Sequence, residues 1–417
     1  MLVSFLRKIL LIFIVSSAIA QTETEVAPPY NIKTVSFVQG SKNVVPIFGL
    51  GEGFRFQFDD LFGNEANYYY EIVHCDYNWK PTDIPKTEYL RGFDGQRIQQ
   101  YENSFNTLQT YSHYELPIPN QQTQLLISGN YILKILNEDK DVVFSRKFIF
   151  YENIVNIPMK IRRARTGNLL DYKHNIEFAV NSLVINFQNP LKNVKVAILQ
   201  NGQFNTAIKN VPPQYTIGNE LIYKYDSQTQ FWAGNEFLYF DNNNIRAAGN
   251  NVSRVNSTGG IYSSSLYTNE AKGNYPYSVM PDDNGNFFVH SINATKNEVE
   301  SDYAWIYFSL SAPAFMSKKG IYVNGMFNNY SLSPEYKMDF NAEKNLYEKA
   351  VLIKQGYTNF QYQVADERGN IDAEKAPDGN FWQTENEYTI LVYYRQNNDR
   401  YERVIGKATA NSNVVTN

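Results

Sequence analysis

Apolar and polar residues alternate along much of the chain with the period of two that is typical of β-strands, and helical periodicity is scarce. Residues 54–58 (Phe-Arg-Phe-Gln-Phe) have this alternation. Residues 131–144 read as a hairpin, because the polar segment 137–140 separates two apolar runs. These patterns predict an antiparallel sandwich over residues 28–151, a length typical of immunoglobulin-like domains.

A second block of strands is expected over residues 152–299. Its predicted strands are residues 175–180, 194–199, 219–225 and 234–240. Residues 249–274 are rich in Gly, Asn and Ser and read as a long loop or a meandering edge. Residues 281–286, which contain Asp282-Asp283-Asn284-Gly285, predict a turn into a further short strand.

A third block is expected over residues 300–406. Its predicted strands are residues 303–310, 320–325, 346–353, 359–364 and 389–394. Residues 366–370 read as a hairpin turn, and residues 407–417 read as a small, polar, frayed tail. The expected fold is therefore all-β, with three successive antiparallel β-sandwich domains of immunoglobulin-like type.

The first 20 residues have the pattern of a signal peptide. Arg7 and Lys8 precede the apolar stretch 9–15, and small residues end at Ala20. The apolar stretch is too short for a membrane helix, which needs about 20 apolar residues. We expect cleavage between Ala20 and Gln21, in preference to a retained anchor. No later segment reaches membrane-spanning length, so no membrane span is expected in the mature chain.

Composition narrows the choice of partners. Cys75 is the single cysteine, so the chain cannot form an internal disulfide. The net charge is −4 without a dense Lys/Arg cluster, and nucleic acid is therefore not an expected partner. The 32 tyrosines suit a β-rich fold and equally suit protein interfaces, and both readings stay open.

Catalytic and metal-binding motifs do not emerge from the sequence. The four histidines have no metal-ligand spacing, and neither a nucleophile elbow nor a phosphate-binding loop is present. His74 and Cys75 are adjacent, so on a strand they would face opposite sides and could not act as base and nucleophile. Asp59-Asp60 and residues 282–285 could be acid pairs or a calcium loop, but a turn is the expected role of the latter. We expect no catalytic residue, metal or cofactor.

One pattern hints at a glycan ligand. Residues 320–330 (Gly-Ile-Tyr-Val-Asn-Gly-Met-Phe-Asn-Asn-Tyr), with the aromatic-rich segment 356–362, resemble the starch- and glycogen-binding sandwich modules. In those modules an aromatic platform stacks on sugars, and Tyr330 stands where Trp is usual. Retained sugar binding would make the chain a glycan-binding accessory module of the cell envelope, which is the alternative hypothesis.

Several ordered motifs are more specific. They are residues 74–81 (His-Cys-Asp-Tyr-Asn-Trp-Lys-Pro), 88–93 (Glu-Tyr-Leu-Arg-Gly-Phe), 111–114, 116–120, 128–131 and 231–237 (Phe-Trp-Ala-Gly-Asn-Glu-Phe). This succession resembles the plug protein family of the type 9 secretion system of Bacteroidota, formerly a domain of unknown function. The residues that carry the resemblance are Cys75, Asn78, Trp79, Glu88, Tyr89, Gly92, His113, Tyr114, Gly129, Asn130, Trp232, Asn235, Glu236 and Phe237.

The resemblance implies a non-enzymatic periplasmic protein at the inner face of the outer membrane. Members of the family close the periplasmic mouth of the giant outer-membrane translocon barrel when no cargo is engaged, and the free chain is expected to be a monomer. The motif residues also have a plain structural role. Trp79 and Tyr89 can fill a sandwich core, and Gly129-Asn130 suits a turn before a strand. The motifs do not identify the residues that contact the translocon.

Overall fold

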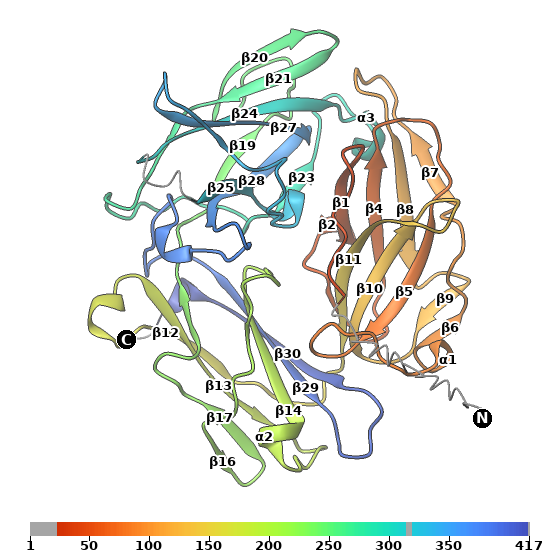
Figure 1. Ribbon diagram of the computed structural model, residues 1–417, viewed down its shortest axis with the longest axis vertical. Helices are drawn as coiled ribbons and strands as arrows, with labels where there is room; N and C mark the ends of the chain where they lie inside the picture. Colours follow the sequence, from red (N-terminus) through yellow and green to blue (C-terminus); the bar gives the residue numbers. More distant parts are fainter. Residues whose placement is uncertain (1–22, 314–318, 416–417) are drawn as a thin grey trace, which may run out of the picture.

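The computed structural model describes residues 23–313 and 319–415, which form three β-sandwich domains (Figure 1). The all-β prediction is confirmed. The predicted signal peptide, with its cleavage point between Ala20 and Gln21, lies outside the described residues. Within the described ranges, none of the helices has the length and apolar character needed to cross a membrane.

The first domain covers the region predicted at residues 28–151. Its elements are β1 (Ile32–Gln39), β2 (Lys42–Asn43), β3 (Ile47–Gly49), β4 (Phe54–Asp60), β5 (Tyr69–Cys75), α1 (Lys86–Tyr89), β6 (Leu90–Gly92), β7 (Gln100–Asn103), β8 (Ser112–Ile118), β9 (Thr123–Leu125), β10 (Gly129–Leu136) and β11 (Val142–Tyr151). One sheet has the order β2-β1-β4-β8-β7, the other has the order β3-β11-β10-β5, and β6 pairs with β9. The predicted hairpin is β10 and β11.

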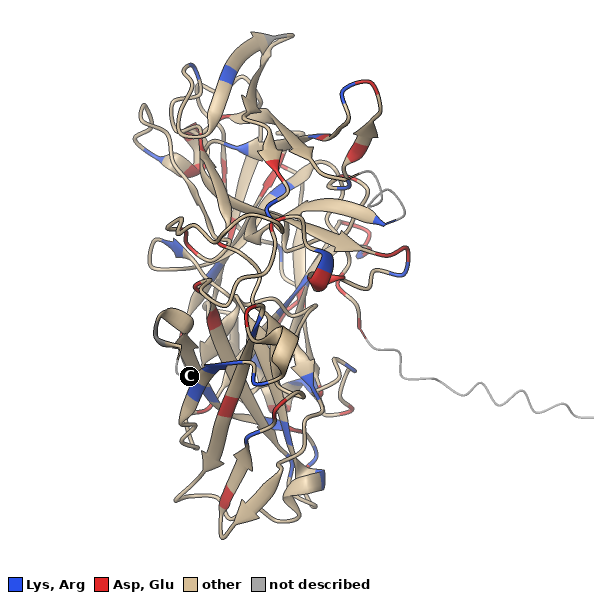
Figure 2. Cartoon of the chain, turned by 90° about the vertical axis from the view of Figure 1, so that its left-hand side faces the viewer, with Lys and Arg blue, Asp and Glu red and all other residues tan. Residues whose placement is uncertain are grey.

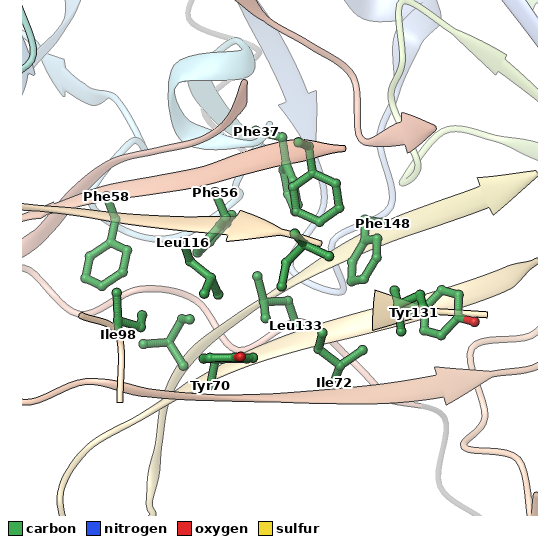
Figure 3. Close-up of a cluster of buried hydrophobic side chains, with 14 of the residues drawn as sticks. Phe37, Phe56, Phe58, Tyr70, Ile72, Ile98, Leu116, Tyr131, Leu133 and Phe148 are labelled. Carbon is green, nitrogen blue, oxygen red and sulfur yellow. The ribbon is translucent and has the colours of Figure 1, made fainter. Parts of the chain in front are cut away.

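An aromatic core fills the space between these two sheets. Phe54, Phe56 and Phe58 all point into it, as the alternation along β4 predicts. Side chains from the two sheets meet in Figure 3, where Phe37, Phe56 and Leu116 lie opposite Ile72, Leu133 and Phe148. The first domain therefore has a complete core of its own.

The second domain consists of two separate parts of the chain. Its elements are β12 (Met159–Arg163), η1 (Gly167–Leu169), β13 (Lys173–Asn181), α2 (Pro190–Asn193), β14 (Val194–Gln200), β15 (Ile208–Lys209), β16 (Tyr215–Ile217), β17 (Glu220–Tyr223), β18 (Gln230–Trp232), β29 (Glu387–Tyr394), β30 (Arg403–Asn411) and η5 (Ser412–Val414). One sheet has the order β12-β13-β17-β16, with β18 also paired with β13, and the other has the order β15-β14-β29-β30.

The third domain is inserted between these two parts. Its elements are β19 (Leu238–Asp241), β20 (Val252–Thr258), β21 (Ile261–Leu266), β22 (Asn269–Glu270), β23 (Phe287–Val289), α3 (Asn297–Glu300), β24 (Tyr303–Ser311), β25 (Gly320–Asn324), η3 (Met326–Asn328), β26 (Asp339–Asn341), β27 (Leu346–Lys354), β28 (Gly356–Ala365) and η4 (Ala373–Lys375). One sheet has the order β19-β28-β23, with β25 also paired with β28. The other has the order β20-β21-β24-β27-β26, with β22 paired with β24.

This arrangement differs from the three successive blocks expected from the sequence. β29, which was expected in the third block, pairs with β14 along the whole of β14. β29 pairs with β14 because both faces of β29 are buried. Ile390 and Val392 enter the second core, while Leu391 and Tyr393 face the first domain. A strand with two buried faces must lie between two layers, and β29 takes that position between the second core and the first domain.

Two segments with polar composition form strands, one in agreement with the edge alternative of its prediction and one against its prediction as a tail. Residues 249–274, predicted as a long loop or edge, contain β20 and β21, which pair as a hairpin at the edge of the six-stranded sheet. Residues 407–411, predicted as part of a frayed tail, form the end of β30 and pair with β29. Polar side chains are tolerated in both because only one face of each strand is covered.

The three domains contact one another pairwise. The first domain lies beside both of the others, and the second and third lie end to end along the longest axis (Figure 1). One apolar cluster joins the first and second domains through Tyr77, Leu199 and Tyr393. A smaller one joins the first and third domains through Tyr111 and Leu352. Figure 2 shows acidic and basic positions interspersed along the length of the molecule.

Candidate functional site

The motif at residues 74–81 builds the joint between the first and second domains. Tyr77 is buried, and its hydroxyl donates to the Val196 carbonyl (2.6 Å) and accepts the Asn210 N–H (2.9 Å). Its own N–H donates to the Glu402 carboxylate (2.7 Å). Burial raises the pKa of the Tyr77 phenol to about 12, so the hydroxyl stays protonated as a donor. Tyr77 thus makes three hydrogen bonds to the second domain.

Two further motif residues extend this joint. The Asn130 amide donates to the Asp76 carbonyl (2.9 Å), and its oxygen accepts the Tyr393 hydroxyl of the second domain (2.9 Å). The Trp79 ring meets the Phe204 ring edge-on, with centroids 5.8 Å apart. Asn78 is exposed and belongs to the turn, where its N–H donates to the Asp76 carboxylate (2.8 Å). Trp79, which was expected to fill a sandwich core, packs instead between the first and second domains.

His74 and Cys75 face opposite sides of β5, as predicted. The His74 ring contacts the Tyr131 ring inside the first domain, whereas Cys75 belongs to the interdomain cluster. Burial lowers the pKa of His74 to about 4 and raises the pKa of the Cys75 thiol to about 12. The imidazole is therefore neutral and the thiol protonated near neutral pH, which is not the arrangement of a base and a nucleophile.

Four other motif residues shape the first domain itself. Tyr89 and Tyr114 are buried core residues, and the Tyr114 hydroxyl donates to the Ala66 carbonyl (2.7 Å). A Cβ at Gly92 would lie 2.0 Å from the Gln122 carbonyl oxygen, and one at Gly129 would lie 2.2 Å from the His74 ring. Both positions therefore require glycine because neighbouring groups approach closely.

Glu88, in contrast, lies at the surface. Its carboxylate pairs with Arg400 of the second domain (2.5 Å). Both side chains are partly exposed, so this contact contributes little to the joint.

A buried ion pair joins the first and third domains. The Asp59 carboxylate lies 2.6 Å from Lys354 Nζ, accepts the Tyr303 hydroxyl (2.6 Å) and contacts His113 Nδ1 (2.6 Å). Burial alone would raise the pKa of Asp59, but the Lys354 ammonium and the His113 contact outweigh it and lower that pKa. Lys354 also donates to the Glu298 carbonyl (2.6 Å).

His113 was predicted as a motif residue without a role, and the structure places it in this pair. Asp59 was considered from the sequence only as half of an acid pair, and Lys354 was missed. A charged residue at the end of an apolar strand is a weak sequence signal, because most such residues are solvated.

The motif at residues 231–237 lies at the joint between the second and third domains. The Asn235 amide donates to the Asp378 carbonyl (2.8 Å), and the Phe237 N–H donates to the Asp282 carboxylate. Glu236 accepts the Tyr277 hydroxyl and the Glu385 N–H. Trp232 belongs to β18, and Lys173 lies over its ring.

Three carboxylates gather at this joint, namely those of Glu236, Asp282 and Glu385. Burial, followed by repulsion from the other two, raises the pKa of Asp282 to about 7. Burial likewise raises the pKa of Glu236 and of Glu385. Among residues 23–313 and 319–415, no three or more His, Cys, Asp and Glu side chains are grouped so that they could hold a metal ion. Because their pKa values are raised, these carboxylates can hold protons at the joint.

The predicted turn at residues 281–286 is present next to this group. The Asn286 N–H donates to the Asp283 carbonyl (3.1 Å), and Asn284 and Gly285 both have positive φ. The hydrogen bond and the backbone angles agree with the predicted turn.

Tyr330, the residue proposed for sugar stacking, is 6% exposed. Its hydroxyl lies against Gly285, where an added Cβ would be 2.4 Å away. The preceding Gly-Met-Phe-Asn turn is closed by the Asn328 side chain, which accepts the Gly325 N–H (3.1 Å). Tyr330 is a packing residue and does not offer a ring face to a ligand, so the stacking hypothesis at this position is wrong.

Comparison with known proteins adds a family and a relative. Residues 32–152 match the family described as type 9 secretion system plug protein 1st domain. A crystal structure of a hypothetical protein from Parabacteroides merdae is 29% identical, with a TM-score of 0.87 over 93% of this chain and 98% of that chain. A biofilm-associated protein domain is 7% identical, with a TM-score of 0.16 over 94% of this chain and 61% of that chain. None of the curated protein sequences matches this chain.

Proposed function

Because residues 32–152 belong to the family of type 9 secretion system plug protein first domains, we propose that this chain binds the giant outer-membrane translocon barrel of that system and occludes its periplasmic opening when no cargo is engaged. Family membership, which bears out the resemblance found in the sequence, is the observation that carries the proposal. It ties the chain to type 9 secretion.

The way in which the three domains are joined supports an occluding role. A barrel wide enough for large cargo leaks small solutes when idle, so a stopper must keep its shape against the pore. Tyr77 fixes the first domain to the second, and the Asp59–Lys354 pair fixes the first to the third. A body that is already ordered loses little conformational entropy on docking.

The proposed activity is binding, without catalysis. The state of the His74–Cys75 pair supports this, because a protonated thiol is a poor nucleophile. The glycan-binding alternative loses its proposed stacking residue, since Tyr330 is buried.

Gene deletion tests the proposal. Without this protein, cells should admit a large antibiotic that the outer membrane normally excludes, such as vancomycin, while cargo secretion continues at least in part. A strain that lacks both this protein and the translocon is the control, and it should be as impermeable as its parent. If the single deletion stays impermeable with the translocon present, occlusion is wrong. If secretion stops without leakage, the protein is an assembly factor.

The proposed location has a separate test. We expect the mature chain to begin at Gln21 and to fractionate with the periplasm or the inner face of the outer membrane. N-terminal sequencing of protein purified from its native cells measures this directly. Retention of residues 1–20 would contradict the expectation.

A further inference from the structure

Four aliphatic side chains project from one end of the second domain. Leu183, Val184, Leu191 and Ile217 are between 63% and 107% exposed, and we refer to them as the apolar tip. They come from the loop after β13, from α2 and from the β16–β17 hairpin. These elements lie at the lower end of the longest axis in Figure 1, so the rest of the molecule does not shield them from a flat surface.

Hydrogen bonds hold these side chains outward. The Ser182 hydroxyl accepts the N–H groups of Val184 (3.1 Å) and Ile185 (3.0 Å), which fixes the loop. Asn219, at the hairpin, donates to the carbonyls of Ser182 (2.8 Å) and Ile185 (2.7 Å). Ile185 packs against the second core, so Leu183 and Val184 stay exposed beside a fixed neighbour. The exposure is therefore built into the fold.

The charge of this end differs from that of the whole chain. Residues 181–193 and 211–219 contain no Asp or Glu, and Lys192 is their single charged residue, although the chain has 42 acidic residues in 417. Arg395 adds a second exposed cation, and its backbone N–H donates to the Asn193 carbonyl at the end of α2 (3.0 Å), which places it at this end. Two acidic residues border this end, Glu220 at the start of β17 and Asp399 in the loop that carries Arg395, and both are only partly exposed. The Arg395 side chain donates to the Asp399 backbone carbonyl (3.1 Å).

This chemistry fits a lipid surface better than a protein surface. Protein hot spots are enriched in Trp, Tyr and Arg, whereas Leu and Val are under-represented there. Aliphatic side chains flanked by Lys and Arg are typical of segments that rest in a membrane interface, where the cations meet anionic headgroups. We propose that the apolar tip inserts into the interfacial region of a phospholipid bilayer, with Lys192 and Arg395 against anionic headgroups.

Such binding is weak and reversible. One myristoyl chain gives only marginal membrane binding, and four aliphatic side chains give no more. The proposal does not depend on the proposed function. If both hold, the tip raises the effective concentration of the chain at the membrane that contains the barrel.

Sedimentation with phospholipid vesicles tests the proposal. Purified mature chain should bind vesicles of phosphatidylethanolamine and phosphatidylglycerol, and binding should weaken as salt increases. The double variant Leu183→Ser/Val184→Ser should bind about tenfold more weakly with an unchanged melting temperature, because both side chains are exposed. Val279→Ser/Ile292→Ser is the control, since it removes two other exposed aliphatic side chains, and it should bind like the parent.

Two results would overturn the proposal. One is failure of the parent chain to bind these vesicles at low salt, and the other is equal binding by the tip variant. If the parent chain does not bind vesicles and the tip variant no longer co-purifies with the translocon, the apolar tip is a protein contact and the lipid proposal is wrong. Vesicle binding is measured without the translocon, so its outcome is separate from the permeability test of occlusion.

Discussion

The raised pKa of Asp282 makes the joint between the second and third domains sensitive to pH. The unfolded chain releases this proton near the ordinary value of 3.8, whereas the folded chain holds it until about 7. The folded state therefore binds more protons between about pH 4 and pH 7, and stability must fall as the pH rises through this window. The full contribution is present below about pH 4.

Glu385→Gln should reduce this pH dependence. The Glu385 Oε2 atom accepts the Asn284 amide (3.0 Å), while its buried Oε1 atom has no hydrogen-bond partner among the described residues. Gln keeps the acceptor and removes one of the two charges that repel Asp282, the other being that of Glu236. We expect a gain in the free energy of unfolding on the order of 1 kcal/mol at pH 7, and a flatter profile from about pH 4 to pH 7.

Urea unfolding across this pH range measures the effect. Glu343→Gln is the matched control, because Glu343 is exposed and should leave the profile unchanged. A profile for Glu385→Gln that parallels the parent's would contradict the account of Asp282.

Individual residues divide into those that the sequence predicts and those that it does not. Tyr89 was expected in a core and is buried, since an aromatic among strand residues usually is. The partners of Asp59 were not predictable, because Lys354 is 295 positions away in the sequence. A pair of that kind depends on how two domains dock, and local pattern does not encode docking.

At the scale of elements, Gly129 determines how closely β10 and β5 can pair. A Cβ at this position would lie 2.2 Å from His74 Nε2, and the His74 ring is held by its Nδ1 contact with the Thr82 hydroxyl (2.7 Å). Gly129→Ala should therefore destabilise the protein by about 3 kcal/mol, the upper end of the usual cost of overpacking. Thermal unfolding measures the change.

Gly40→Ala provides the comparison for this variant. Gly40 has positive φ, but an added Cβ would meet nothing within 4 Å, so only backbone strain of about 1 kcal/mol is expected. If both variants lose the same free energy of unfolding, the close approach to His74 does not contribute to the cost of Gly129→Ala.

The strands themselves were largely predictable, whereas their partners were not. The alternation at residues 54–58 and the hairpin at residues 131–144 are confirmed, because both depend on neighbours in sequence. The apolar run at residues 389–394 predicted a strand correctly but not its pairing with β14. A run without alternation indicates burial on both faces and leaves the covering layers unspecified.

At the scale of the whole molecule, the third domain should fold on its own within new boundaries. Its core cluster consists of residues between Leu238 and Val364. A fragment of residues 235–383 should therefore unfold cooperatively. The block predicted from the sequence, residues 300–406, should not, because it lacks β19 to β23 and carries β29 without β14.

Circular dichroism during urea titration distinguishes the two fragments. If residues 300–406 unfold cooperatively and residues 235–383 do not, the inserted third domain is not the folding unit.

The contact between the first and third domains should depend on charge neutralisation in the Asp59–Lys354 pair. Both side chains are buried, so Lys354→Met leaves an uncompensated carboxylate and should cost about 3–5 kcal/mol. Adding Asp59→Asn removes that charge and should restore part of the stability, so the effects of the two substitutions on the free energy of unfolding should not be additive.

Lys349→Met is the control on the same strand. Its ion pair with Asp339 is 3.6 Å long and mostly exposed on the Asp339 side, so its loss should change the free energy of unfolding by less than about 1 kcal/mol. Urea unfolding of the four proteins measures these differences. If Lys354→Met is no worse than Lys349→Met, the buried pair does not hold the first domain against the third, and the rigidity that supports the plug proposal must come from the Tyr77 joint and the Tyr111–Leu352 cluster.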